Sequence, residues 1–175
     1  MRGLAWAAVV VAAVGGCGKG GGKGPAAVEQ PEAIYRRMLA VMQAADGRAQ
    51  WAMLSQRRQN ESLQALAEIT GDAEKLKSIA AQVGITPEAL KAMGPEEFST
   101  TVMKWRLTDV ESTKRFQSLG EPQVAKDGNR LRVWALTPDG RFSYVLHLVD
   151  DGGAWKVDEE KEEEYEVKDV GSGKK

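Results

Sequence analysis

Cys17 is the one cysteine of this 175-residue chain, and it stands between an apolar segment and a tract of glycine and lysine. The apolar segment runs unbroken from Leu4 to Val14, after a positively charged start at Arg2. As a helix it spans roughly 16 Å at about 1.5 Å per residue, which is too short for a hydrocarbon core of about 30 Å. The segment is therefore typical of a secretory signal rather than of a membrane-spanning anchor.

The residues Val14-Gly15-Gly16-Cys17 resemble a bacterial lipobox, in which an aliphatic and two small residues precede a cysteine. The resemblance implies cleavage between Gly16 and Cys17, transfer of diacylglycerol to the Cys17 thiol, and acylation of the new amino group. Each buried CH₂ contributes about 0.8 kcal/mol, so two or three acyl chains hold a protein stably at a membrane. The alternative is an ordinary secretory signal with an incidental cysteine, although a lone thiol in an exported protein has no disulfide partner.

The segment that follows Cys17 is rich in glycine. Such a composition cannot bury enough apolar area to offset its ordering entropy, and it predicts a flexible tether with a reach of about 20 Å. We therefore expect a signal peptide at residues 1–16 and a lipidated cysteine with its tether at residues 17–30. Gly18 rather than Asp follows the cysteine, which by bacterial sorting logic favours the outer membrane and places the domain in the periplasm or at the cell surface. A P-loop in this stretch is excluded because no Ser or Thr follows its lysines.

His147 is the one histidine and the first residue to consider as a general base. No His, Cys or carboxylate stands near it at metal-ligand spacing, and a general base also needs an orienting partner. Ser55 and Ser143 lack a Gly-x-Ser-x-Gly elbow or a Ser/His/Asp context. Asp109 precedes the predicted sheet, where acidic side chains are usually solvated. The sequence therefore predicts no catalytic residue, no metal and no cofactor.

Aromatic side chains provide the candidate ligand pocket, because the chain has five tryptophans beside three tyrosines and three phenylalanines. Several of them around one hollow would form an apolar pocket with N–H and O–H donors, suited to a small apolar ligand. The alternative is that they fill the interface between helices and sheet. The candidate pocket residues are Trp51, Trp105, Tyr144 and Trp155.

A second candidate surface lies on the predicted strand RLRVWAL, where Arg130, Arg132 and Trp134 share one face. A tryptophan beside two arginines could contact a protein partner, or form a stacked surface with no further role. The chain has 24 basic and 25 acidic side chains and a net charge of −1, so it has no electrostatic footprint for nucleic acid. The expected partners are the membrane, through Cys17, and a small apolar ligand or an envelope protein.

The elements that must position these residues fall into two halves. Up to Trp105, apolar residues recur at helical spacing, and Pro31, Thr86 and Pro87 stand where helices begin. We expect helices over residues 31–46, 48–69, 71–84, 86–94 and 94–105. The methionines of the first helix, at this spacing, are expected in the core rather than on a binding surface.

After Trp105 the pattern changes to runs of β-branched and aromatic residues, separated by turn signals at residues 127–129, 138–140 and 151–153. These features predict antiparallel hairpins. In the run over residues 142–149 one alternate set is more apolar and should face the core: Phe142, Tyr144, Leu146 and Leu148. The predicted class is α+β, with N-terminal helices packed on one face of a curved antiparallel sheet.

Two stretches, residues 46–55 and 149–158, carry a resemblance: D-G-x-x-x-W-x-M-L-S and V-D-D-G-G-A-W-K-V-D. They are similar to the nuclear transport factor two-like superfamily, including lumazine-binding-like and polyketide cyclase-like domains of small bacterial lipoproteins of unknown function. The resemblance implies a cone-like domain, with a sheet wrapped around helices and a pocket, over residues 31–160. Residues 161–175, acidic and then rich in Gly, Ser and Lys, are expected to form a disordered tail. The alternative there is that Tyr165 and Val167 extend the last strand.

Fold does not decide function in such a superfamily. The function expected from the sequence is a lipid-anchored envelope protein whose domain binds a ligand or partner without catalysis. The alternative is a pocket enzyme of the cyclase, isomerase or dehydratase type. The two differ in one requirement, because an enzyme needs an ionisable group with a perturbed pKa at the bottom of its pocket.

Overall fold

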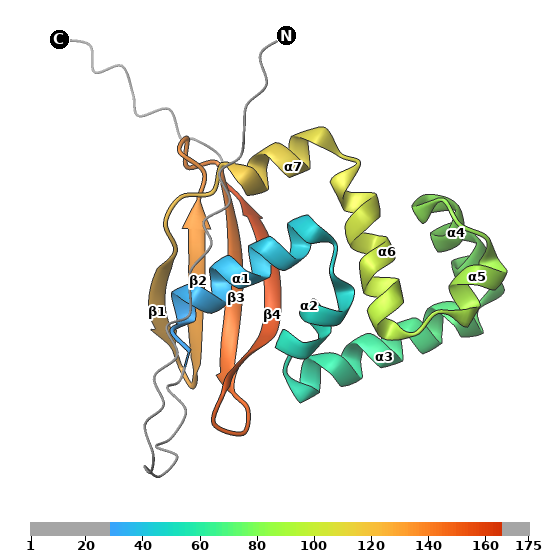
Figure 1. The fold of residues 1–175 in the computed structure, drawn as a ribbon, viewed down its shortest axis with the longest axis horizontal. Coiled ribbons are helices and arrows are strands. Elements are labelled where there is room, and N and C mark those ends of the chain that lie inside the picture. The colour runs from blue at the N-terminus through green and yellow to red at the C-terminus, as the bar shows by residue number, and fades with distance from the viewer. Residues whose placement is uncertain (1–28, 166–175) are drawn as a thin grey trace, which may run out of the picture.

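A computed structural model describes residues 29–165, so the expected signal peptide, Cys17 and most of the tether lie outside the described residues. Within residues 29–165 the helices come first and the strands follow, which confirms the α+β class (Figure 1). The helices are α1 (Pro31–Ala44), α2 (Gly47–Met53), α3 (Gln56–Gly71), α4 (Ala73–Val83), α5 (Pro87–Ala92), α6 (Pro95–Leu107) and α7 (Val110–Gln117). None of these helices has the length and apolar character needed to span a bilayer.

The sheet is an open antiparallel meander in the order β1-β2-β3-β4, as the hairpin pattern predicts. Its strands are β1 (Gln123–Asp127), β2 (Arg130–Leu136), β3 (Phe142–Asp150) and β4 (Trp155–Glu164). The turns contain Gly128 at φ 62° and Gly140 at φ 67°, a backbone region that glycine adopts without steric cost. These turns therefore depend on glycines at fixed local positions, which can be recognised from the sequence.

The core lies between the helices and one face of the sheet. The four β3 residues expected to face it are all buried there, packed with residues of β2 and with Ile34 and Met38 of α1. Figure 1 shows α1 crossing this face, while α3, α4 and α5 extend away from the sheet. Burial of each such side chain contributes about 1.5–3 kcal/mol, so this interface dominates the stability of the domain.

The expected continuous helix over residues 48–69 is wrong, because the chain breaks at Leu54 and Ser55. Leu54 forms an isolated parallel bridge with Val157 of β4, and the Ser55 N–H donates to the Val157 carbonyl at 2.8 Å. The Ser55 hydroxyl then accepts from the Arg58 N–H and starts α3. Pairing with a distant strand thus outweighs the local helical preference and gives α3 a new direction.

Two elements differ from the sequence expectation in extent. Helix α7, after the N-cap residue Asp109, is not among the helices expected from the sequence; none of its residues is fully buried, and Phe116 packs against the core. Strand β4 continues to Glu164, beyond the domain end expected at residue 160. Tyr165, the last described residue, donates its N–H to the Arg141 carbonyl at 2.8 Å. Val167, the other residue of the extended-strand alternative, lies outside the described residues.

Candidate ligand-binding site

The candidate site is a cleft between α2, α3 and α6, closed on one side by β4. Its volume is about 290 Å³, at the lower end of the range of about 300–1,000 Å³ usual for small-molecule sites. Its walls combine polar side chains with an apolar part that includes Trp51, Leu54, Phe98, Val102 and Met103. The cleft can therefore hold a compact ligand with an apolar body.

The cleft exists because α2 and α6 touch at one end while α3 turns away. The Gly47 N–H donates to Thr100 Oγ1 at 3.0 Å, and a Cβ at Gly47 would lie 2.1 Å from the Glu96 carbonyl oxygen. Only glycine permits this approach. The break at Leu54 and Ser55 sends α3 in a different direction, which leaves the cleft between the diverging helices.

Asp158 fixes the start of α3 against β4. It is the extra residue of a β-bulge, since Leu148 pairs with Val157 but His147 pairs with Glu159. Its buried carboxylate accepts from the Ser55 hydroxyl at 2.7 Å and from two Arg57 nitrogens at 2.9 and 2.6 Å. The Arg57 hydrogen bonds hold the pKa of Asp158 below its ordinary value, although burial opposes them. Asp158 therefore stays ionised, and its charge-assisted hydrogen bonds join β4 to the start of α3.

Glu160 forms the floor of the cleft on the helix-covered face of the sheet. It pairs with the core residue Leu146 in the β3–β4 register, and it lines the cleft. Its Oε2 accepts from the Tyr144 hydroxyl at 2.8 Å, and its Oε1 accepts from Gln50 Nε2 at 3.4 Å. Burial, and then the Glu160 charge, raise the pKa of Tyr144 well above its ordinary value. Tyr144 therefore remains a hydrogen-bond donor to Glu160 at any physiological pH.

The other charges along the cleft are compensated by neighbours. Arg106 of α6 pairs with Glu162 of β4, and Arg58 pairs with Glu61 one turn along α3 at 3.5 Å. These side chains are roughly 34 to 44 % exposed, so each pair contributes little to stability. Within these ion pairs, the charges of Arg58 and Arg106 are balanced by their carboxylate partners.

The structure brings some of the four candidate pocket residues to the cleft and places others elsewhere. Trp51 lines the cleft, and Tyr144 lies in the core with its hydroxyl on Glu160. Trp105 is 38 % exposed and lines a separate shallow hollow beside the α6–α7 turn. Trp155 is partly buried against the core. The four residues therefore do not surround one hollow.

Sequence reasoning missed Glu160, Gln50 and Phe98. The acidic end of the chain reads as solvated, although Glu160, Glu162 and Glu164 alternate along one face of β4 and meet Tyr144, Arg106 and Arg115. The sequence carries no signal for this arrangement, because acidic residues occupy both alternate sets of positions in this run.

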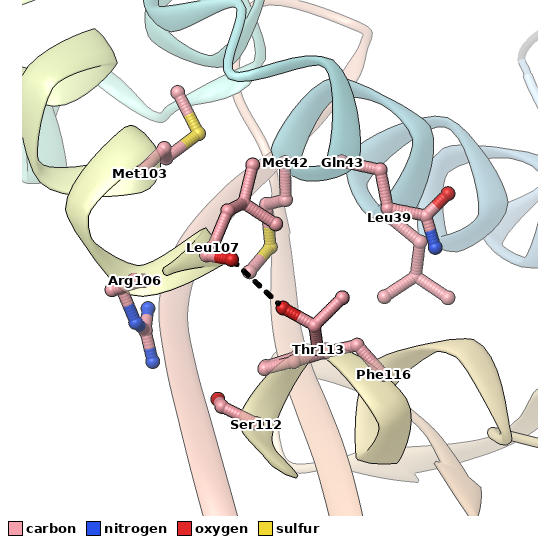
Figure 2. A pocket seen from close by; sticks show the side chains of 9 residues that line it. All are labelled: Leu39, Met42, Gln43, Met103, Arg106, Leu107, Ser112, Thr113 and Phe116. Carbon is pink, nitrogen blue, oxygen red and sulfur yellow. Dashed lines mark hydrogen bonds between the residues drawn. The ribbon is translucent and has the colours of Figure 1, made fainter. Parts of the chain in front are cut away.

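A second hollow lies between α1, α6 and α7, and Figure 2 shows its mainly apolar lining, including Leu39, Met42 and Phe116. The Thr113 hydroxyl donates there to the Leu107 carbonyl at 3.3 Å. The cavity holds about 30 Å³, which is about the volume that one water molecule occupies in the liquid. It is a packing defect too small for an organic ligand.

His147 lies on the opposite face of the sheet from the cleft. Its Nδ1 is 3.5 Å from a Glu159 carboxylate oxygen and its Nε2 is 3.6 Å from one of Asp127. Because the two ring nitrogens face different carboxylates, they share no point where a metal could bind, and residues 29–165 contain no cluster suited to a metal ion. Burial lowers the pKa of His147 despite the Glu159 charge, so the ring is neutral at pH 7.

The residues of the candidate partner surface also lie on this opposite face. The Arg132 guanidinium is 4.7 Å from the centre of the Trp134 ring, a cation–π arrangement, and it pairs with Glu163 at 2.9 Å. Arg130 lies 3.5 Å from Glu159. All three side chains are partly buried and already paired. The charges on this face are therefore paired, although the buried Nδ1 of His147 has no hydrogen-bond partner among the described residues.

Two further residues considered in the sequence have structural partners. Asp109 accepts from the Glu111 and Ser112 N–H groups as the N-cap of α7. Ser55 donates to Asp158, with no histidine among its hydrogen-bond partners. Comparisons of the chain with protein-family models, with curated proteins and with solved structures find no match.

Proposed function

We propose that the domain is a non-catalytic binding module for a small ligand with an apolar body, and that it binds this ligand in the cleft between α2, α3 and α6. The observation that carries the proposal is the cleft itself, about 290 Å³, with aromatic and aliphatic side chains in its walls and the acidic Glu160 on its floor. Apolar walls contribute affinity, and a few placed polar groups orient the ligand.

The proposal includes an envelope location. The lipobox-like residues Val14 to Cys17 support anchoring to a bacterial membrane, with the outer membrane favoured, through acyl chains on Cys17. The finer, cone-like nuclear transport factor two-like architecture remains part of the proposal, supported by helices on one face of a meander and a cleft between them. An envelope protein as partner, rather than a small ligand, is the other form of binding that such a module could provide.

The test fills the cleft from its exposed rim. Ala65 lines the cleft and Ala67 does not, and both are exposed on α3. With indole, 2-phenylethanol and 2-phenylethylamine as probes, we expect thermal stabilisation of the protein by at least one compound. Ala65→Trp should abolish that stabilisation and Ala67→Trp should preserve it. Equal responses of the two variants would contradict binding in the cleft.

The pocket-enzyme alternative has one observation in its favour, which is the ionisable Glu160 on the floor of the cleft. Acid–base catalysis there would need a second proton-transfer group in reach. The Tyr144 hydroxyl lies 2.8 Å from Glu160, but burial and the Glu160 charge raise the pKa of Tyr144 well above its ordinary value, and His147 lies on the other face of the sheet. Chemical change of a bound probe that is lost in Glu160→Gln would favour the enzyme over the binding module.

A further inference from the structure

We infer that the cleft selects an organic cation: a small amine or ammonium group carried on an apolar or aromatic body. This inference rests on the proposed function and names the chemical class of its ligand. It follows from the charges, hydrogen bonds and aromatic walls of the cleft.

Among the charged side chains that line the cleft, Glu160 is the one without an ion-pair partner in the described part of the chain. The lining contains two arginines and two glutamates, so its formal charges sum to zero. Glu61 pairs with Arg58 and also with Arg57, and Arg106 pairs with Glu162. Glu160 is left over, because no Lys, Arg or His within residues 29–165 forms an ion pair with it.

The hydrogen bonds of Glu160 leave room for a stronger donor. Its two partners, the Tyr144 hydroxyl and the Gln50 amide, are both neutral. The bond to Oε2 is short at 2.8 Å, whereas the bond from Gln50 to Oε1 is 3.4 Å, near the limit of hydrogen-bond distance. An ammonium group would form a charge-assisted bond to Oε1, which is about twice as strong as a neutral one.

The walls of the cleft favour the same ligand class. Trp51 and Phe98 line it together with aliphatic side chains, and an aromatic face attracts a cation through its quadrupole. Aromatic rings also bury the apolar body of an amine. A carboxylate or phosphate would meet the opposite condition, because its charge would be desolvated beside the negative charge of Glu160.

The experiment compares three probes of similar shape and different charge on the full chain carrying Cys17→Ser. These are 2-phenylethylamine, 2-phenylethanol and 3-phenylpropanoate, titrated by calorimetry with ligand-observed NMR for weak binding. We expect the amine to bind at least about tenfold more tightly than the alcohol, since hydrogen bonds to charged groups exceed neutral ones by this order. The carboxylate should bind most weakly.

Glu160→Gln is the decisive variant, because glutamine keeps an acceptor for Tyr144 and loses only the charge. It should weaken amine binding at least about tenfold and leave the alcohol unchanged. The matched control is Glu163→Gln, which removes the same charge from the opposite face of β4 and should leave all three affinities unchanged.

The outcomes separate the two proposals. Equal affinities for the three probes, or amine binding that survives Glu160→Gln, would overturn the cation inference while the binding module stands. No binding of any probe in the cleft would overturn both. An amine preference lost equally in both glutamate variants would mean that overall charge, rather than Glu160, attracts the ligand, and would also overturn the inference.

Discussion

At the scale of single residues, the acidic side chains of β4 differ in whether their charge is stabilised by charged or by neutral partners. Asp158 is nearly enclosed and has three hydrogen bonds to neighbouring side chains, so its charge is stabilised within the fold. Glu160 is half-buried and has neutral partners, so its charge is available to a ligand. Two nearby acids on one strand thus have a structural role and a proposed binding role, and the partners of each carboxylate distinguish the two roles.

We expect Asp158→Asn to destabilise the domain by about 1–3 kcal/mol, because it weakens hydrogen bonds to a charged group while the remaining Arg57 is half-exposed. The folded-state pKa of Asp158 lies below the ordinary value of 3.8. Its stabilisation is therefore present above that ordinary value and is lost as the pH falls through the lowered folded pKa. Urea unfolding at about pH 7 and about pH 2 measures this; a gap between wild type and variant that does not shrink in acid would contradict it.

His147 should make stability depend on pH in a separate range. Burial lowers its folded pKa, with Arg130 and Lys161 acting in the same direction and Glu159 and Asp127 against it. The unfolded chain therefore binds a proton more readily, and stability falls as the pH drops below about 6.5. Melting temperatures from pH 7.5 to 5 should fall more for wild type than for His147→Gln. Parallel curves would show that His147 does not contribute.

At the scale of elements, the sequence correctly predicted those features that neighbouring residues in the chain determine. The β3 face was visible because every second residue is apolar, and the helix starts were visible through Pro31 and Thr86. The break at Leu54 was not, because its cause is pairing with Val157, about a hundred residues away in the chain. Helix α7 was missed because it has only two turns and two apolar residues, Val110 and Phe116, of which Phe116 contacts the core.

The β-bulge at Asp158 shows why the floor of the cleft could not be predicted. Without the extra residue, Leu146 would face Glu159, and Glu160 would point to the opposite side of the sheet. One inserted residue thus decides which glutamates face the helices. No local pattern marks a bulge in so acidic a run, whereas the apolar alternation of β3 is independent of it.

The contact between α2 and α6 leads to a prediction with an internal control. Gly47→Ala places a methyl group 2.1 Å from the Glu96 carbonyl oxygen, which forces the helices apart. We expect a loss of about 1–3 kcal/mol, or roughly 4–12 °C in melting temperature. Gly71→Ala, near the end of α3, has open space around its new methyl group and should be neutral or slightly stabilising. Similar melting temperatures for the two variants would contradict the close approach.

At the scale of the whole molecule, the proposal describes a ligand-binding domain held to a membrane by its N-terminal side. The described domain begins beside Pro31 of α1, and the proposed acylation site lies at Cys17, so the two are joined by the expected tether. The cleft opens between α2, α3 and α6, and α1 is not among its lining elements. Anchoring and ligand binding therefore depend on different parts of the chain and can be tested separately.

Cys17→Ser should move the protein from the membrane fraction to the soluble fraction after expression in a bacterial host, since it removes the thiol that would carry the acyl chains. Fractionation followed by immunoblotting measures this change. Probe binding in the cleft should be the same for both forms. Retention of Cys17→Ser in the membrane fraction would contradict the anchor without affecting the binding module.

The edges of the sheet have a further consequence if the proposed anchor concentrates the protein on a membrane. Unpaired strand edges are templates for aggregation when copies meet side by side. Here β1 is only five residues long, and β4 carries a bulge, a bridge to Leu54 and an almost uninterrupted run of charged side chains. Neither edge offers a long, flat, apolar strand to a neighbour. The same bulge that orients Glu160 therefore also helps crowded copies of the domain to remain separate molecules rather than growing into fibrils.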